Sequence, residues 1–456
     1  MHSCDTFALG KDFYHEHKNF FAKNSDRPLG EAQPLCFYPR AEHKAGDMLH
    51  CTHLSIPQTN RTYAVMGCRP YWIWGFEMGV NECGLAIGNE AEGSRCEAET
   101  EEGMLGMDML RLALERAATA REGVDVIAQM LTRYGQNANA NPLYDRRYEN
   151  SFLLVDPQEI YLMETAGRHW VAKRITSWAA ISNTYSIGTE FDLCSDGLEE
   201  YARARHWLHP DEPFDFAKAY LKPGIQQRGS TPRWRRLQKL ITACNGALTI
   251  PDAQHILRDH FEDEIICPRF GGTYGGFISI CMHAMTWDAS QTAASLLYSW
   301  HDTLGPVCWY APSSPCCSVY IPVYWTGAVP AILSQADGVY DPASLWWVSQ
   351  RLVTLVSIDE ARFGKAVRNR LQLLEESIRM QAADTETAAC ALINANKKDE
   401  ALSLLSRFTQ TCAEETLTLM HQSCEEISQQ LKVDGGIYGI RREVILDYAD
   451  RTRLPL

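Results

Sequence analysis

The chain has 456 residues, of which 45% are hydrophobic and 22% charged, and this composition excludes a disordered or fibrous protein because it can form a large core. Its net charge of -14, without a long basic run, disfavours general nucleic-acid binding. The sequence lacks a run of about 18 apolar residues and a secretory signal, so we expect no membrane partner. The 16 cysteines are spread along the chain, which is typical of reduced thiols and predicts a cytoplasmic protein.

The first hundred residues are predicted to be rich in β-strands, because short apolar runs are separated by Pro, Gly and Asn. These runs are residues 19–22, 62–67 and 72–76. Apolar residues three or four apart over 105–134 then predict a helical hairpin or one broken helix that ends at Gly135. A β-meander is expected to follow, with strands at 151–155, 160–164 and 169–172.

The second half of the chain is predicted to alternate again, with a helix at 252–261 and strands at 275–282 and 293–300. Runs of strands separated by blocks of helices indicate layered sheets covered by helices rather than a doubly wound sheet. From Ser357 the pattern becomes helical, since Ser357 and Glu360 fit a capping box, one apolar stripe runs over 363–378 and a second runs over 399–432. This predicts a helical C-terminal extension that packs on the body or on a twin subunit.

The most informative feature is Cys4. If Met1 to Ser3 are removed, its α-amino group, with a reference pKa of about 7.7–8.0, lies beside a thiol with a reference pKa of about 8.5, so one residue supplies both nucleophile and base. Such a site needs a carboxylate to hold the ammonium group and a cation to favour the thiolate. A hairpin that returns to Cys4 would bring Asp26 and Lys23 for these two roles, although residues 24–28 are also good turn formers.

These residues carry a family resemblance. Cys-Asp-Thr-Phe at 4–7 and Lys-Asn-Ser-Asp-Arg-Pro at 23–28 are similar to motifs of the secernin and C69-type dipeptidase family of N-terminal nucleophile (Ntn) hydrolases. This family is distantly related to penicillin V acylase and bile salt hydrolase. Further segments that resemble family motifs follow in family order at 81–90, 150–154, 164–167, 181–183, 281–283 and 314–316.

The resemblance implies an α+β fold, the four-layer αββα Ntn-hydrolase sandwich, with the helical C-terminal extension added. It divides the chain into a propeptide at 1–3, a hydrolase domain at 4–340 and the extension at 341–456. Cleavage between Ser3 and Cys4, autocatalytic by attack of the Cys4 thiol on the preceding carbonyl, would expose the amine.

The resemblance also implies roles for six residues. Cys4 is the expected nucleophile and Asp26 the carboxylate that binds its amine, while Lys23 stands where the acylase relatives have arginine and so keeps the charge but loses the bidentate geometry. The two expected asparagines are Asn89, for the oxyanion hole, and Asn183. Arg233 is the expected arginine, with Arg228 and Arg235 as competing candidates.

The function implied is hydrolysis of amide bonds in dipeptides or small N-acyl compounds, without a cofactor and in a homo-oligomer. The alternatives are an N-acyl amidase or acyltransferase, or a catalytically impaired binding or regulatory protein. If the substrate has a free amino terminus, an acidic group is expected to line its pocket, and Glu77, Glu90 and Glu92 are the candidates.

Other motifs are weaker. Histidines and cysteines gather in the first 53 residues, but no C-x-x-C or H-E-x-x-H spacing is present, so no metal is predicted. His283 is expected to be a buried structural histidine, and Cys316 and Cys317 to be packing thiols. The glycine-rich segment at 271–276 lacks the Lys-Ser/Thr of a phosphate loop and predicts a flexible loop near the site mouth.

Overall fold

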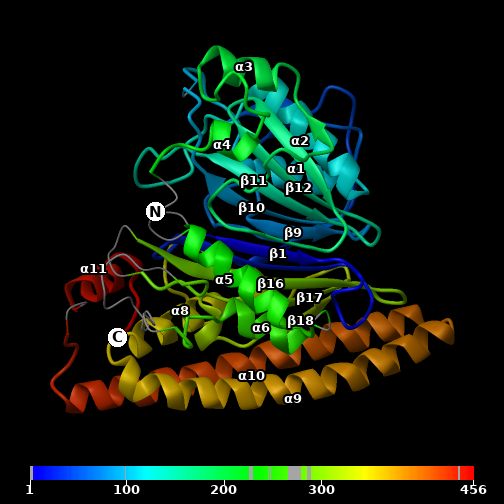
Figure 1. Cartoon of the computed structure of the whole chain (residues 1–456). Helices are drawn as coiled ribbons and strands as arrows, with labels where there is room; N and C mark the ends of the chain where they lie inside the picture. The colour runs from blue at the N-terminus through cyan, green and yellow to red at the C-terminus, as the bar shows by residue number, and fades with distance from the viewer. Residues whose placement is uncertain are drawn as a thin grey trace.

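Two antiparallel β-sheets lie face to face in the centre of the molecule, between outer layers of helices (Figure 1). The computed structural model describes residues 4–97, 99–224, 230–244, 246, 248–264, 279–284, 289–439 and 442–456. Most of the buried apolar side chains form one core that spans both sheets and the helices beneath. The predicted αββα layering with a helical C-terminal region is therefore confirmed.

The smaller sheet carries the start of the described chain. Its order is β14 (Trp178–Ile181), β1 (Asp5–Leu9), β2 (Phe20–Pro28), β16 (Ser290–His301), β17 (Gly305–Pro312) and β18 (Ile321–Tyr324). All neighbours in this sheet are antiparallel. The strand β1 thus lies between its hairpin partner β2 and a strand from far along the chain.

The larger sheet consists of β15 (Leu193–Cys194), β13 (His169–Ile175), β12 (Ile160–Ala166), β11 (Glu149–Val155), β10 (Ala86–Glu92), β9 (Met78–Asn81), β8 (Val65–Cys68) and β3 (Leu35–Tyr38), in this order. It contains the predicted meander as β11 to β13. Two small ribbons lie apart from it, β4 (Ala41–Glu42) with β7 (Arg61–Thr62), and β5 (Met48–His50) with β6 (Ser55–Pro57).

Helices α1 (Gly106–Arg116) and α2 (Ala120–Tyr134) cover the outer face of the larger sheet, as the predicted hairpin, and their apolar sides form a second core with it. The short helices α3 (Leu198–Ala204) and α4 (Phe216–Tyr220) lie at the same end of the molecule (Figure 1). The smaller sheet is covered by α5 (Ser230–Ala243), α6 (Ile250–Leu257), α8 (Leu345–Val356), α9 (Glu360–Asn394) and α10 (Lys398–Val433). The remaining elements are the 3-10 turn η2 (Pro315–Cys317), α7 (Ala331–Ser334) and α11 (Arg442–Thr452).

Three predicted elements differ from the structure. Residues 72–76 form turns instead of a strand, and Gly75 lies so close to α1 that an added Cβ would come within 2.3 Å of the Met107 carbonyl carbon. The capping box at Ser357 is wrong, because Asp359 caps α9 and Ser357 ends α8. Of the strand expected at 275–282, residues 279–282 are not in a strand and the rest lie outside the described residues, as does the segment 271–276.

Every residue of α8 is buried, including the polar Ser349, Gln350 and Arg351. In the described part of the chain, the helices are all too short or too polar to cross a membrane.

Candidate active site

Cys4 stands directly before β1 and is only 4% exposed. The pairing of Asp5 with Asn24 in the β1–β2 hairpin brings the end of β2 alongside Cys4. As a result, the backbone N–H of Asp26 donates to Cys4 Sγ at 3.4 Å. On the other side, the backbone N–H of Cys4 donates to Oδ1 of Asn183 at 3.0 Å, from the segment that follows β14.

Arg233 reaches this point from α5 and is fully buried. Its Nη1 donates to the carbonyl oxygen of Cys4 at 3.2 Å and to Oδ2 of Asp5 at 2.5 Å. Its Nη2 donates to Oδ1 of Asn183 at 2.7 Å. The guanidinium of Arg233 therefore holds both the backbone of Cys4 and Asn183, the residue that accepts from the Cys4 nitrogen. Of the competing arginines, Arg235 is exposed, and Arg228 lies outside the described residues.

Lys23 lies on the face of β2 that points toward the larger sheet. Its Nζ donates to the carbonyl oxygen of Asn89 on β10 at 2.5 Å and lies 3.5 Å from Oε1 of Glu90. Glu90 also accepts from the hydroxyl of Thr6 at 2.5 Å. All of these side chains are buried, so the two sheets are joined at this level by one cation and one carboxylate.

Asp26 is buried completely at the junction of β2 and β16. Its Oδ1 accepts from the hydroxyl of Thr292 at 2.6 Å, whereas Oδ2 has no hydrogen-bond partner among the described residues. The register of β16 shifts between Thr292 and Ala294, a local irregularity of the kind that redirects side chains near functional sites. Burial raises the pKa of Asp26 to about 8, against the opposing effect of Arg233.

Burial also raises the pKa of the Cys4 thiol to about 12, although the nearby charge of Lys23 acts to lower it. While Ser3 remains attached, the nitrogen of Cys4 is a peptide nitrogen and cannot act as a base. With this raised pKa, the thiol is protonated at neutral pH as long as Ser3 is attached. A free α-amine at this position would act on the thiol as a base in its neutral form. In its protonated form it would be a cation beside the neighbouring carboxylates.

A cavity of about 540 Å³ lies next to these residues, and Asn183 is part of its wall. The cavity is lined by both acidic and basic side chains, among them Glu92, Glu149, Arg146, Arg147 and Lys222. Glu92 is buried on β10; its Oε1 accepts from the hydroxyl of Ser151 at 2.8 Å, and its Oε2 has no partner in the described structure. Burial, followed by the charge of Glu164, raises the pKa of Glu92.

The predicted residues fall into two contacting sets. Cys4, Asp26, Asn183 and Arg233 contact one another through Cys4, whereas Lys23 and Asn89 form a neighbouring pair. Asn89 Nδ2 donates to Oδ1 of Asn150 at 3.0 Å, and its hydrogen bonds in the described structure do not include one to Cys4. The residues that could hold a metal ion together in the described structure are elsewhere, at His260, Cys281, His283 and Cys316.

Sequence reasoning missed Asp5 and Thr292, which hold Arg233 and Asp26. Asp5 gives a signal that could have been used, because a charged residue at the start of a largely apolar strand is rarely fully buried without a partner. Thr292 gives none, since threonine is common in strands.

Comparison with known proteins shows which family this chain is similar to. The model of peptidase family C69 matches residues 58–373, which is more than half of the chain. A dipeptidase from Bifidobacterium longum (strain NCC 2705) is 28% identical over 300 residues, which cover 56% of this chain and 53% of that protein. A probable dipeptidase B from Lactococcus lactis subsp. lactis (strain IL1403) is 26% identical over 288 residues, which cover 56% of this chain and 58% of that protein.

The matched region thus spans little more than half the length of these two relatives. Among solved structures, a mutant conjugated bile acid hydrolase from Clostridium perfringens aligns with a TM-score of 0.37 and 13% identity, covering 68% of this chain and 89% of that chain. The family model matches more than half of the chain, including most of the strands of the two sheets. This chain therefore belongs to peptidase family C69.

Proposed function

We propose that this protein is a cysteine hydrolase of the Ntn type, which cleaves the amide bond of dipeptides after Met1 to Ser3 have been removed. The observation that carries the proposal is the environment of Cys4, whose nitrogen lies 3.0 Å from Asn183 Oδ1 and whose sulfur lies 3.4 Å from the Asp26 nitrogen. The cavity that Asn183 lines adjoins this point. The names of the matched relatives support a dipeptide as substrate.

In the proposed maturation, the thiol of Cys4 attacks the carbonyl carbon of Ser3, and the peptide bond to the Cys4 nitrogen is replaced by a thioester. Water then hydrolyses the thioester, which releases the leader with a carboxylate and leaves Cys4 with a free amine and thiol. Asn183 Oδ1, which accepts from the Cys4 nitrogen at 3.0 Å, and the buried carboxyl group of Asp26 would then bind the resulting ammonium group.

In the proposed turnover, Cys4 Sγ attacks the substrate carbonyl while the α-amine takes the thiol proton and passes it to the leaving nitrogen. Asn89 uses one of its two amide hydrogens toward Asn150, so the second can serve the oxyanion. Such a donor is worth about 3 kcal/mol of transition-state stabilisation. A water molecule activated by the same amine then hydrolyses the acyl-enzyme. Arg233 acts as a positioning residue, because it holds Cys4 and Asn183.

Glu92 is the proposed binding group for the free amino terminus of the substrate. Of the three acidic candidates, Glu77 contacts Arg27 and Glu90 contacts Lys23, whereas Glu92 lines the cavity. An ammonium group would provide the partner that Oε2 of Glu92 does not have among the described residues. A hydrogen bond to a charged group such as this ammonium is worth about 1.5–3 kcal/mol, which is about 10–100-fold in affinity.

Two measurements test the proposal together. Intact-mass analysis is expected to show that the wild-type protein begins at Cys4 and that Cys4→Ala keeps the leader. Hydrolysis assays on dipeptides and on their N-acetyl forms are expected to show turnover that Cys4→Ala abolishes. An active protein that still carries Met1 to Ser3 would contradict the free-amine mechanism.

The Glu92→Gln variant tests the substrate class, with Glu97→Gln as the control because Glu97 lines the same cavity but is exposed. Glu92→Gln is expected to raise KM for dipeptides by about 10–100-fold and to leave N-acetyl substrates unchanged. An equal loss on both substrate types would refute a role in binding the amino terminus.

A catalytically impaired binding or regulatory protein is the second candidate. The carboxylate of Glu90 lies beside Lys23 and offsets part of the positive charge that would favour a thiolate at Cys4. A processed wild-type protein with no turnover of either substrate type would favour it. Cytoplasmic location, homo-oligomer formation and the domain boundary at 340 remain predictions from the sequence.

A further inference from the structure

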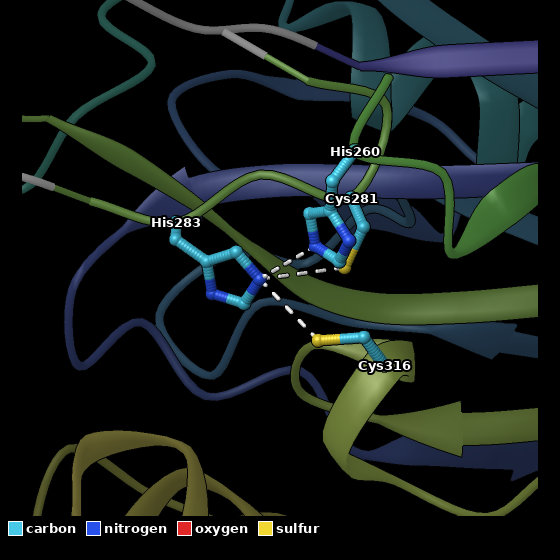
Figure 2. Close-up of side chains that lie close together, drawn as sticks. All are labelled: His260, Cys281, His283 and Cys316. Atoms are coloured by element: carbon cyan, nitrogen blue, oxygen red, sulfur yellow. Dashed lines mark hydrogen bonds between the residues drawn. The ribbon is translucent and has the colours of Figure 1, made fainter. Parts of the chain in front are cut away.

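Four side chains with metal-binding atoms converge outside the site of Cys4. They are His260, Cys281, His283 and Cys316, and Figure 2 shows their imidazole and thiol groups pointing toward one another. They come from three segments: His260 follows α6, Cys281 and His283 lie in the segment before β16, and Cys316 belongs to η2 after β17. The two cysteines are buried, with exposures of 0% and 5%.

The distances between these groups match a tetrahedral zinc site. All four ligand atoms lie within 4.8 Å of one another. Nε2 of His283 lies 3.1 Å from Nε2 of His260, 3.6 Å from Sγ of Cys281 and 3.3 Å from Sγ of Cys316. Around Zn²⁺, bond lengths of about 2.0–2.1 Å to nitrogen and about 2.3 Å to sulfur put ligand atoms roughly 3.3–3.8 Å apart. The three separations from His283 lie within a few tenths of an ångström of this range.

Hydrogen bonds with neighbouring residues hold His260 and the backbone at or next to the two cysteines, as is usual for metal ligands. While Nε2 of His260 faces the cluster, its Nδ1 lies 3.1 Å from Oε1 of Glu262, which is the carboxylate–histidine arrangement found behind many zinc ligands. The backbone N–H of Cys281 donates to Asp259 O at 3.1 Å. Arg258 Nε donates to the carbonyl oxygen of Pro315 at 2.9 Å, next to Cys316. The ligands are therefore fixed relative to one another by the protein itself.

We propose that His260, Cys281, His283 and Cys316 bind one Zn²⁺ in a closed structural site. Two thiolates and two imidazoles suit zinc and exclude magnesium and calcium, which prefer oxygen ligands. Each thiol loses its proton to solvent when the ion binds. Since four protein ligands complete a tetrahedron, the ion has no open position for water or substrate.

The proposed site ties the segment before β16 to the smaller sheet. Met282, between two of the ligands, donates its backbone N–H to the hydroxyl of Thr292 at 2.9 Å, and this hydroxyl donates to Asp26. The ion would thus stabilise the segment that supports Asp26 without taking part in the chemistry at Cys4. The zinc proposal does not depend on the proposed function.

The test is metal analysis of the purified full-length protein. Elemental analysis is expected to find about one zinc per chain, and Cys281→Ser/Cys316→Ser to reduce this below ~0.1. Cys308→Ala is the control, because it removes an equally buried thiol from the strand before η2. After zinc is exchanged for Co²⁺, the wild type is expected to show the visible bands of tetrahedral cobalt and a thiolate-to-cobalt charge-transfer band.

A milder variant keeps the test independent of folding. Glu262 is 57% exposed, so Glu262→Gln leaves the core intact and is expected to weaken zinc binding by about tenfold or more. Glu264→Gln is its control, since Glu264 contacts Lys239 instead. A wild-type protein without zinc and without the cobalt charge-transfer band, or one in which Cys281 and Cys316 form a disulfide, overturns the proposal.

Discussion

The side chain of Arg233 donates to the carbonyl oxygen of Cys4 at 3.2 Å, although 229 positions separate the two residues. The same guanidinium contacts Asn183 and forms a fully buried ion pair with Asp5. A helix outside the sheet thereby holds the two residues at the start of the first strand. Because an ion pair in this environment has little access to water, loss of either partner leaves an uncompensated charge.

We therefore expect Arg233→Met to lower the free energy of unfolding by about 3–5 kcal/mol, measured by urea denaturation. Asp5→Asn/Arg233→Met should recover at least half of this loss, because the buried carboxylate has also been removed. Activity should not recover, since Asn183 and Cys4 still lack their common donor. Arg235→Met on the exposed side of the same helix should change stability by less than about 0.5 kcal/mol. A single Arg233→Met variant as stable as the wild type would refute this account.

Gly88 on β10 provides the space for Lys23. A Cβ added at Gly88 would lie 2.6 Å from Lys23 Cδ and 2.8 Å from Phe21 Cζ. Gly88→Ala should therefore displace Lys23 and lower kcat by about 10²-fold, as expected for a misplacement near the reacting groups. Gly79→Ala is the control, because its Cβ would be 2.7 Å from Met66 O but touches no part of the site. If both variants lose the same activity, general overpacking explains the loss and the role of Gly88 is wrong.

The stability of the unprocessed chain should fall as pH rises. Asp26 has a raised pKa of about 8 in the folded chain and an ordinary pKa near 3.8 when unfolded, so the folded state binds the proton more tightly. Its stabilising effect is complete below the unfolded pKa and disappears as pH rises to about 8. Between about pH 4 and pH 8, the urea midpoint of Cys4→Ala, which is expected to retain residues 1–3, should decrease.

Adding Asp26→Asn to this variant should make the decrease smaller, and the difference between the two variants isolates Asp26 from Asp5 and Glu90, whose pKa values burial also raises. A midpoint whose pH dependence is the same in both variants would show that Asp26 titrates normally.

Thr292 links Asp26 to the segment that carries Met282. Thr292→Val removes both hydrogen bonds at nearly constant volume and should reduce kcat by about tenfold, because one oxygen of Asp26 then loses its donor. Thr292→Ser should restore activity, since it keeps the hydroxyl. Steady-state kinetics on a dipeptide will show the effect, and a fully active Thr292→Val variant would show that this link is dispensable.

The sequence alone predicted those parts of the fold and site that depend on pairing between segments close together in the chain. The approach of Asp26 to Cys4 follows from one hairpin, and the meander and the α1–α2 pair follow from their periodicity and turn residues. It did not predict contacts between segments that are far apart in the chain. Nothing local places Arg233 against Asp5, and the complete burial of α8, polar residues included, depends on the strand and helices that pack around it. His260, Cys281, His283 and Cys316 escaped detection because they come from three segments without a standard ligand spacing.

On the side away from β1, the neighbour of β2 in the smaller sheet is β16, and Thr292 pairs with Asp26 across 266 positions of sequence. During translation, the chain must therefore emerge from the ribosome well past β16 before the surroundings of Cys4 can be completed. Contacts this distant in sequence form slowly and late in folding. In the proposed maturation, release of the leader would therefore wait until most of the polypeptide has been made, which would protect partly synthesised chains from premature self-cleavage.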